Sequence, residues 1–296
     1  MRRFLALLAV LVVAGCGSIG VQAHTISLAY KAGDTYRYGF KMVLKYTIAA
    51  QGLSMPLNID LGAKETVTVK SVDSTGTADI TVAISDAALK MTTGDTTNST
   101  STTTPTSIEM KIASDGRIVS INGSALGSQS FPGLSGTQGG LITAILPDKA
   151  VKPGDTWTKN YDEPNPLGSG TIHATSNNTY LRDEKVGSVN SAVVESKINT
   201  NLDMTIDLAA MLGGSGASPF PSGGGTGGVQ GLAMKGTSTS DITSWIDTSA
   251  KRVVKTHSTG KVDATLTFNM AAGSTTPGLS GPITFKGTQS LDLTPA

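Results

Sequence analysis

The sequence has little of the chemistry that most metalloproteins and thiol enzymes use. Its 296 residues include one cysteine, Cys16, and three histidines. A single cysteine excludes a disulfide within the chain, a cysteine-rich zinc site and a redox pair. The fold must therefore be held by apolar packing, and a chain of this length buries enough surface for that.

Long hydrophobic runs and an excess of one charge are also missing. The longest apolar run, residues 4–13, is about ten residues and too short to cross ~30 Å of hydrocarbon as a helix. The chain has 23 basic and 22 acidic residues, and charged residues make up 15% of it. A near-neutral chain lacks the broad basic field that nucleic acid requires, so we expect no nucleic-acid partner.

The start of the chain has the pattern of an export signal. Two arginines at positions 2 and 3 precede the apolar run, which leads into Val13-Ala14-Gly15-Cys16. Small residues ending on a cysteine resemble the lipobox of bacterial lipoproteins, whose cysteine carries diacylglycerol after cleavage. We expect a signal peptide over 1–15, lipidation at Cys16 and a flexible tether over 16–24. The protein would then be anchored in the cell membrane or outer membrane, on the extracytoplasmic side.

Strict alternation of apolar and polar residues dominates the rest of the chain. The clearest case runs from Tyr36 to Ile48, where every second residue is apolar. Successive side chains of a strand lie on opposite faces, so this segment predicts a long strand with one apolar face. Similar patterns recur over residues 66–72, 78–84, 108–112, 117–121, 198–208, 262–270 and 283–285.

These segments predict an all-β fold of ten to twelve strands joined mostly by short turns. Short connections favour antiparallel meander pairing, and strands this long must coil. We therefore expect a coiled antiparallel sheet forming a half-barrel or barrel-like sandwich, as a single domain over 25–296. One helix is predicted over Gly139–Leu146. The Thr/Ser-rich stretch 92–107 and the Gly/Ser/Pro-rich stretch 213–228 lack apolar residues and predict long surface loops.

A short motif occurs twice. Lys31-Ala-Gly-Asp-Thr-Tyr36 matches Lys152-Pro-Gly-Asp-Thr-Trp157, and each precedes a β-ribbon. Either a duplication of halves 25–121 and 150–296 or reuse of one turn explains it. Together with Leu146-Pro147, the motif resembles segments of an uncharacterised family of bacterial exported β-rich lipoproteins. That resemblance implies a domain type and no catalytic residue. More loosely, the chain is similar to half-barrel lipid-carrier lipoproteins.

Motifs that carry catalysis or bind cofactors are not found. No serine has glycines two residues before and after it, as a hydrolase elbow requires. The histidines, His24, His173 and His257, have no partner at zinc-ligand spacing. No glycine-rich stretch continues into Gly-Lys-Ser/Thr. We therefore predict no enzyme activity, no metal and no cofactor.

The apolar strand faces carry the functional prediction. They form either the packed core of a sandwich or the wall of a cavity that takes a lipid or other apolar ligand. The candidate ligand face consists of Phe40, Met42, Leu44, Leu202, Met204, Ile206, Leu266 and Phe268. The alternative function is that of a structural or partner-binding surface lipoprotein without a small-molecule ligand, acting through 92–107 and 213–228.

Overall fold

A computed structural model describes residues 23–122, 143–164, 168–207, 229–270 and 281–296. The described chain is all-β and contains no helix, so no helix there is long and apolar enough to cross a bilayer. It has twelve strands: β1 (Thr35–Ala50), β2 (Leu53–Val72), β3 (Ala78–Thr93), β4 (Thr96–Thr102), β5 (Thr106–Ile112), β6 (Ile118–Asn122), β7 (Thr156–Pro164), β8 (Gly168–Val186), β9 (Val189–Asp207), β10 (Val229–Asp247), β11 (Val253–Met270) and β12 (Ile283–Pro295). The predicted fold class is confirmed.

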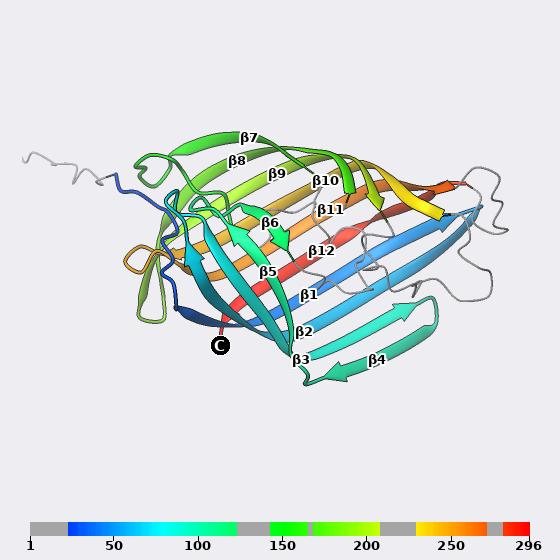
Figure 1. Cartoon of the computed structure of the whole chain (residues 1–296), viewed down its shortest axis with the longest axis horizontal. Helices are drawn as coiled ribbons and strands as arrows, with labels where there is room; N and C mark the ends of the chain where they lie inside the picture. The colour runs from blue at the N-terminus through cyan, green and yellow to red at the C-terminus, as the bar shows by residue number, and fades with distance from the viewer. Residues whose placement is uncertain (1–22, 123–142, 165–167, 208–228, 271–280) are drawn as a thin grey trace, which may run out of the picture.

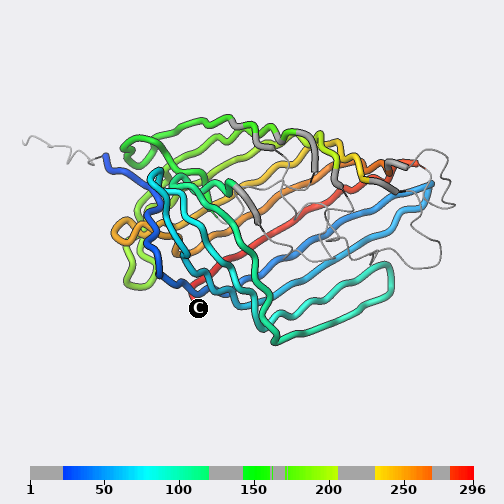
Figure 2. Tube along the Cα trace, viewed as in Figure 1, coloured from blue at the N-terminus to red at the C-terminus, as the bar shows by residue number. Residues whose placement is uncertain are grey.

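All twelve strands belong to one antiparallel sheet. Its order is β6-β5-β3-β2-β1-β12-β11-β10-β9-β8-β7, with β4 paired to the side of β3. The chain is a meander whose first and last strands pair in the middle, from Tyr38 opposite Pro295 to Ala50 opposite Ile283. β6 and β7 do not pair with each other, so the sheet stays open. Figures 1 and 2 show it as a long, curved half-barrel.

The strands are long, and their inner faces are apolar. β2 has 20 residues, which span about 66 Å at ~3.3 Å per residue. Along β1 the even-numbered residues from Tyr38 to Tyr46 are mostly buried, while the odd-numbered ones, such as Lys41 and Lys45, face solvent. The predicted strand 36–48 lies within β1. The alternation that predicted it is therefore the alternation between the concave and the convex face.

β3 contains a bulge that divides the sheet. Its first part pairs with β5 as far as Ile84, and its second part pairs with β4 from Ala87. Between them Asp86 has a φ of 49°, and the register with β2 shifts opposite Gly62 and Lys64. In Figure 1 the first part of β3 and the strands β5 and β6 fold across the front of one end, whereas β4 projects away from it.

The loop predicted over 92–107 is wrong for most of its length. Residues 96–102 form β4, and Thr106 already belongs to β5. All seven side chains of β4 are exposed, as expected for a stretch without apolar residues. The strand forms nevertheless, because threonine favours extended backbone and β3 supplies partners for its amides and carbonyls. The stretch 213–228 lies outside the described residues.

The helix predicted over Gly139–Leu146 is also wrong where the structure describes it, from Thr143 onward. Residues 143–146 are not helical and lie in the interior, where Ala144, Ile145 and Leu146 are fully buried. The Ala144 amide donates to Ser244 Oγ at 2.7 Å, and Ile145 donates to Ser196 Oγ at 2.8 Å. The apolar run that suggested one helical face is thus buried on all sides, with its amides bonded to the sheet.

The tether predicted over 16–24 ends earlier than expected. His24 pairs with Val151 through two backbone hydrogen bonds of 2.9 and 3.0 Å, and its ring packs edge-on against Tyr180. Ile26 and Leu28 follow as buried residues of the core. His24 therefore belongs to the folded domain, because it pairs with Val151 and the residues that follow it are buried in the core. Cys16 and the signal lie outside the described residues.

The two copies of the repeated motif adopt the same turn. Gly33 and Gly154 have φ values of 90° and 94°. The amide of Gly33 donates to Val69 on β2, as that of Gly154 donates to Tyr180 on β8. A backbone position with a positive φ favours glycine, so the geometry of the turn accounts for the glycine in both copies. Duplication of the two halves stays a prediction.

Candidate ligand-binding face

The buried apolar side chains form two clusters at opposite ends of the half-barrel. The first, here called the filled end, joins the start of β1 and the end of β2 to β3, β5, β6 and the far strands β8–β11. It also holds residues outside the strands: Ile26, Leu28, Ala144, Ile145, Leu146 and Val151. At this end the front and back of the curved sheet meet around residues 143–146, here called the inserted segment (Figure 1).

The second cluster, here called the apolar face, draws only on strands among the described residues. Its buried members lie on β1, β2, β9, β10 and β11 and are Met42, Leu44, Tyr46, Leu57, Ile59, Leu202, Met204, Leu232, Met234, Val262, Ala264 and Leu266. All of them point to the concave side. These side chains are at most 7% exposed, so the face is covered in the structure. Burial of such side chains is worth about 1.5–3 kcal/mol each.

The structure brings most of the predicted ligand residues into this cluster. Five of them are buried members: Met42, Leu44, Leu202, Met204 and Leu266. Phe40 and Phe268 are partly buried and pack against it, and Phe40 also touches the filled end. Ile206 pairs with Leu232 in the backbone register, but its side chain lies outside the described residues. That this face binds a ligand stays a prediction.

Sequence reasoning missed the contributions of β2 and β10 to the apolar face. Leu57 and Ile59 follow Pro56, which obscured the strand, and Leu232 and Met234 follow a glycine-rich stretch. The signal was present in β2, where Leu57 and Ile59 alternate with polar residues, but not in β10, where alanine lies between Leu232 and Met234. Three methionines from three strands, Met42, Met204 and Met234, give this face flexible side chains that adapt to a partner's shape.

A belt of buried polar side chains separates the two clusters on the concave side. It consists of Thr200 on β9, Ser238 and Ser240 on β10, Ser258 on β11 and Gln289 on β12, all at most 8% exposed. The register places Ser240 opposite Gly260 and Gly260 opposite Gln289, so these three form one row across the sheet. The sequence did not predict this belt, because a serine or threonine in an alternating pattern suggests that the apolar strand face has ended there.

Gln289 has one satisfied and one unsatisfied end. Its Oε1 accepts a hydrogen bond from the Tyr46 hydroxyl at 3.3 Å. Its Nε2 is buried and has no hydrogen-bond partner among the described residues. Burial raises the pKa of Tyr46 to about 12, so the hydroxyl stays protonated and remains a donor. A buried donor without an acceptor costs about 1–3 kcal/mol.

Glu65 on β2 is the buried acid of the concave side. It is 7% exposed and lies opposite Tyr38 on β1 and Ile84 on β3. Burial raises the pKa of its carboxyl to about 7. Tyr38 does not donate to it; the Tyr38 hydroxyl donates instead to the backbone oxygen of Val253 at 2.8 Å. Glu65 therefore gains a proton near neutral pH.

Ion pairs close the filled end. Lys159 on β7 contacts Asp115 at 2.9 Å and Asp148 at 2.8 Å, and Arg117 contacts Asp115 at 2.9 Å. Burial opposes ionisation of Asp115, but the hydrogen bonds from Lys159 and Arg117 outweigh it, and its pKa lies below the usual value. The Asp115 backbone oxygen also accepts from the Leu146 amide at 2.8 Å. This cluster fixes the inserted segment.

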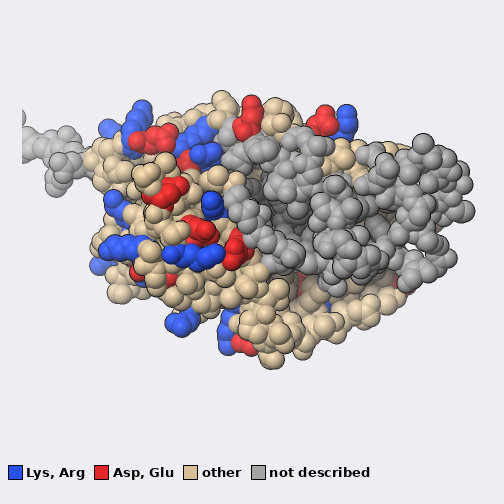
Figure 3. All heavy atoms as spheres, in the orientation of Figure 1, with Lys and Arg blue, Asp and Glu red and all other residues tan. Residues whose placement is uncertain are grey.

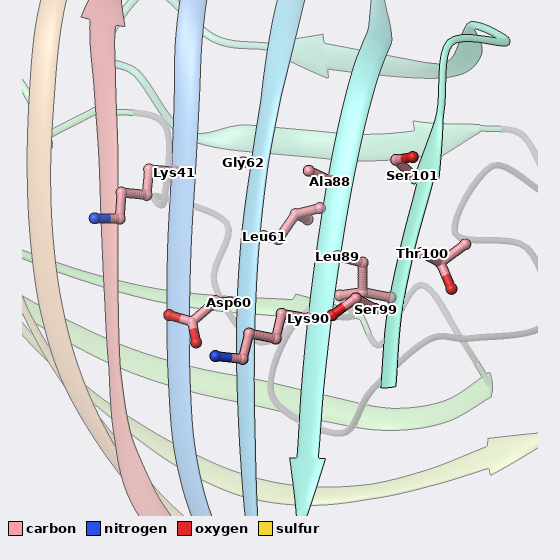
Figure 4. Close-up of a pocket in the computed structure, with 10 residues that line it drawn as sticks. All are labelled: Lys41, Asp60, Leu61, Gly62, Ala88, Leu89, Lys90, Ser99, Thr100 and Ser101. Carbon is pink, nitrogen blue, oxygen red and sulfur yellow. The ribbon is translucent and has the colours of Figure 1, made fainter. Parts of the chain in front are cut away.

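The described part of the outer surface has a groove beside the β3 bulge and charges of both signs. The groove has a volume of about 470 Å³ and is lined by Lys41 on β1, by residues 60–62 and 88–90 on β2 and β3, and by residues 99–101 on β4 (Figure 4). Basic and acidic side chains are interspersed on the face seen in Figure 3. His173 and His257 each contact one aspartate, at 2.6 Å. Within the described residues, no three metal-ligating side chains come together.

Comparisons with known proteins give little. No family model matches the chain, and no curated protein matches it. A solved structure of lipovitellin, concerned with lipid–protein interactions, is similar with a TM-score of 0.41 and 13% identity. The match covers 90% of this chain but only 26% of the lipovitellin chain. The resemblance to a family of exported lipoproteins stays a prediction.

Proposed function

We propose that this protein is a non-enzymatic, extracytoplasmic lipoprotein that binds a lipid or other apolar ligand on its apolar face. The observation that carries the proposal is the composition of the apolar face, a concave wall of apolar side chains contributed by β1, β2, β9, β10 and β11.

The chemistry of the wall supports an apolar ligand. Inward positions of β1 and β9–β12 hold no charged residue in the described chain, since the lysines and aspartates of these strands fall on the outer positions. A concave, apolar surface with few polar groups is typical of lipid sites. Its methionines allow chains of different shape to be accommodated.

The described chain begins at the end of the half-barrel opposite the apolar face. The described chain begins at residue 23 beside the filled end, as the blue segment in Figure 1 shows. Cys16 lies eight positions before His24, which is at most about 28 Å of extended chain. An anchor at Cys16 would therefore hold the filled end near the membrane and direct the apolar face away from it.

Ligand binding is tested on the full chain carrying Cys16→Ser. Organic extraction followed by mass spectrometry should find bound lipid, and a fluorescent fatty acid should bind the delipidated protein. Met204→Trp fills part of the apolar face and should weaken that binding. Met110→Trp, the same change at the filled end, should not. A protein that is empty after purification and takes up no probe would overturn the proposal.

The proposed anchor is tested separately. Wild type should incorporate radiolabelled palmitate and fractionate with membranes, whereas Cys16→Ser should do neither. Equal membrane fractionation of both proteins, with no label in either, would remove the anchor from the proposal while leaving the ligand test intact.

The projecting strand β4 favours a second candidate, a partner-binding surface. One edge of β4 pairs with β3, and no described strand pairs with the other edge. A free edge is a template for strand addition by another chain. Replacing residues 95–103 with a two-residue turn should abolish capture of a protein partner and leave lipid binding unchanged. Partner capture that survives the replacement would exclude this surface.

A further inference from the structure

We infer that the ligand on the apolar face is a neutral acyl ester, whose carbonyl oxygen accepts a hydrogen bond from Nε2 of Gln289. The inference rests on the proposed function and names the class of ligand. Its starting point is the only group on the concave side of β12 that is polar, buried and without an acceptor in the described chain.

The position of Gln289 suits a ligand that spans the belt and the apolar face. Its side chain is 8% exposed and lies opposite Leu44, a fully buried member of the apolar face. The bond from Tyr46 holds Oε1 and leaves Nε2 as the free end. A chain resting on the apolar face would therefore reach a hydrogen-bond donor where the apolar surface ends.

Gly260 determines where the amide lies. A Cβ at this position would be 2.9 Å from Nε2 and 3.2 Å from Cγ of Gln289, so the amide lies over the glycine. The next residue in the row is Ser240 on β10. Adjacent strands are about 4.8 Å apart, so the amide over Gly260 lies next to the serine on β10. The donor is thus directed along the belt, which also carries Ser238 and Ser258.

The charge of the surroundings selects a neutral head group. Inward positions of β1 and β9–β12 carry no lysine, arginine or histidine in the described chain, and the acid of the concave side is Glu65. An ionised carboxylate at the belt would be buried without a cation, which is costly. An ester carbonyl needs only a donor, and an amide N–H supplies it.

The test compares three ligands with one chain length on the Cys16→Ser protein: methyl dodecanoate, dodecane, and dodecanoate at pH 8. Binding is measured by displacement of a fluorescent apolar probe. Wild type should bind the ester roughly three- to tenfold more tightly than the alkane, as one hydrogen bond provides. It should bind the carboxylate more weakly than the ester. Gln289→Met should bind ester and alkane equally, with alkane affinity unchanged.

Thr288→Met is the matched control, because Thr288 is the exposed neighbour of Gln289 on the outer face of β12 and its replacement keeps the donor. It should retain the preference for the ester. If Gln289→Met fails to fold, the wild-type preference for the ester over the alkane decides instead. Equal affinity of wild type for ester and alkane, or a preference that survives Gln289→Met, would overturn the inference while the proposed function stands. Failure to bind any of the three would overturn the proposed function itself.

Discussion

Ser196 on β9 accepts a hydrogen bond from the backbone amide of Ile145, at 2.8 Å, inside the filled end. The same hydroxyl donates to Asn178 Oδ1 at 2.6 Å, and Trp157 Nε1 donates to the Ile145 carbonyl at 3.2 Å. A segment without regular structure is thus buried in a β-fold because side chains of the sheet replace the partners that its backbone lacks.

Removing the Ser196 hydroxyl should destabilise the protein. Ser196→Ala leaves the buried amide of Ile145 without an acceptor, and we expect a loss of about 1–3 kcal/mol in the free energy of unfolding. Urea denaturation followed by tryptophan fluorescence measures it. Ser258→Ala is the control, since that serine is equally buried on the same face, while the amides of residues 144 and 145 donate to Ser244 and Ser196. Equal losses for the two variants would contradict this role of Ser196.

Two glycines in similar turns should respond differently to alanine. Gly76 and Gly116 have φ values of 84° and 91°. The Cβ of an alanine at 76 would meet nothing closer than 3.6 Å, but at 116 it would lie 2.4 Å from Thr143 Cγ2. Gly76→Ala should cost about 1–2 kcal/mol for the left-handed backbone alone.

Gly116→Ala should cost clearly more, because the inserted segment must also move. Thermal unfolding of both variants, with near-UV circular dichroism to report on Trp157, measures the difference. Gly116→Ala that is no less stable than Gly76→Ala would show that the segment does not pack against this turn in solution.

Strand existence and strand faces were predictable from the sequence, because burial on one face of a sheet imposes a period of two. The alternation in β1 and β11 survives in the structure almost residue for residue. The inserted segment was not predictable, since Ile145 and Leu146 are buried by contacts with residues far away in the sequence. Their spacing alone fits a helix as well as a buried extended chain.

The sequence contains a signal for the β3 bulge, but the bulge was not predicted. Ile80, Val82 and Ile84 occupy even positions, whereas Leu89 and Met91 occupy odd ones. Both sets face the concave side, since Val82 lies opposite Val67 and Leu89 opposite Leu61. A change of parity within one strand indicates an extra residue. The polar belt could not be predicted in this way, because the sequence does not show that a serine faces inward until the pairing register of its strand is known.

The bulge itself makes a prediction at Asp86, whose φ is 49°. Asp86→Val puts a β-branched residue in the left-handed region and should cost about 1–2 kcal/mol or more. Asp86→Gly should be nearly neutral. Its ion pair with Lys64, at 2.8 Å, is solvent-exposed and contributes little. Thr81→Val, in the regular part of β3, is the control and should not destabilise. Urea denaturation checks the order; equal stability of the valine and glycine variants at 86 would contradict a fixed bulge.

Glu65 should make stability fall as pH rises towards neutrality. Its pKa is about 7 in the folded protein against 4.5 for an ordinary glutamate. Between these values the folded state holds a proton that the unfolded state has lost, so raising the pH favours unfolding. The contribution is fully present below pH 4.5, declines up to about pH 7 and then stays constant. The shift corresponds to about 3 kcal/mol, taken as an order of magnitude.

Glu65→Gln should remove this dependence, because the amide does not titrate and resembles the protonated acid. Urea denaturation of wild type and variant at pH 5 and pH 8 measures it: the variant should match wild type at pH 5 and exceed it at pH 8. Glu109→Gln is the control, since Glu109 is half exposed and pairs with Lys70 on the outer face. A gap between wild type and Glu65→Gln that is the same at both pH values would mean that Glu65 ionises in the folded state as it does in the unfolded chain.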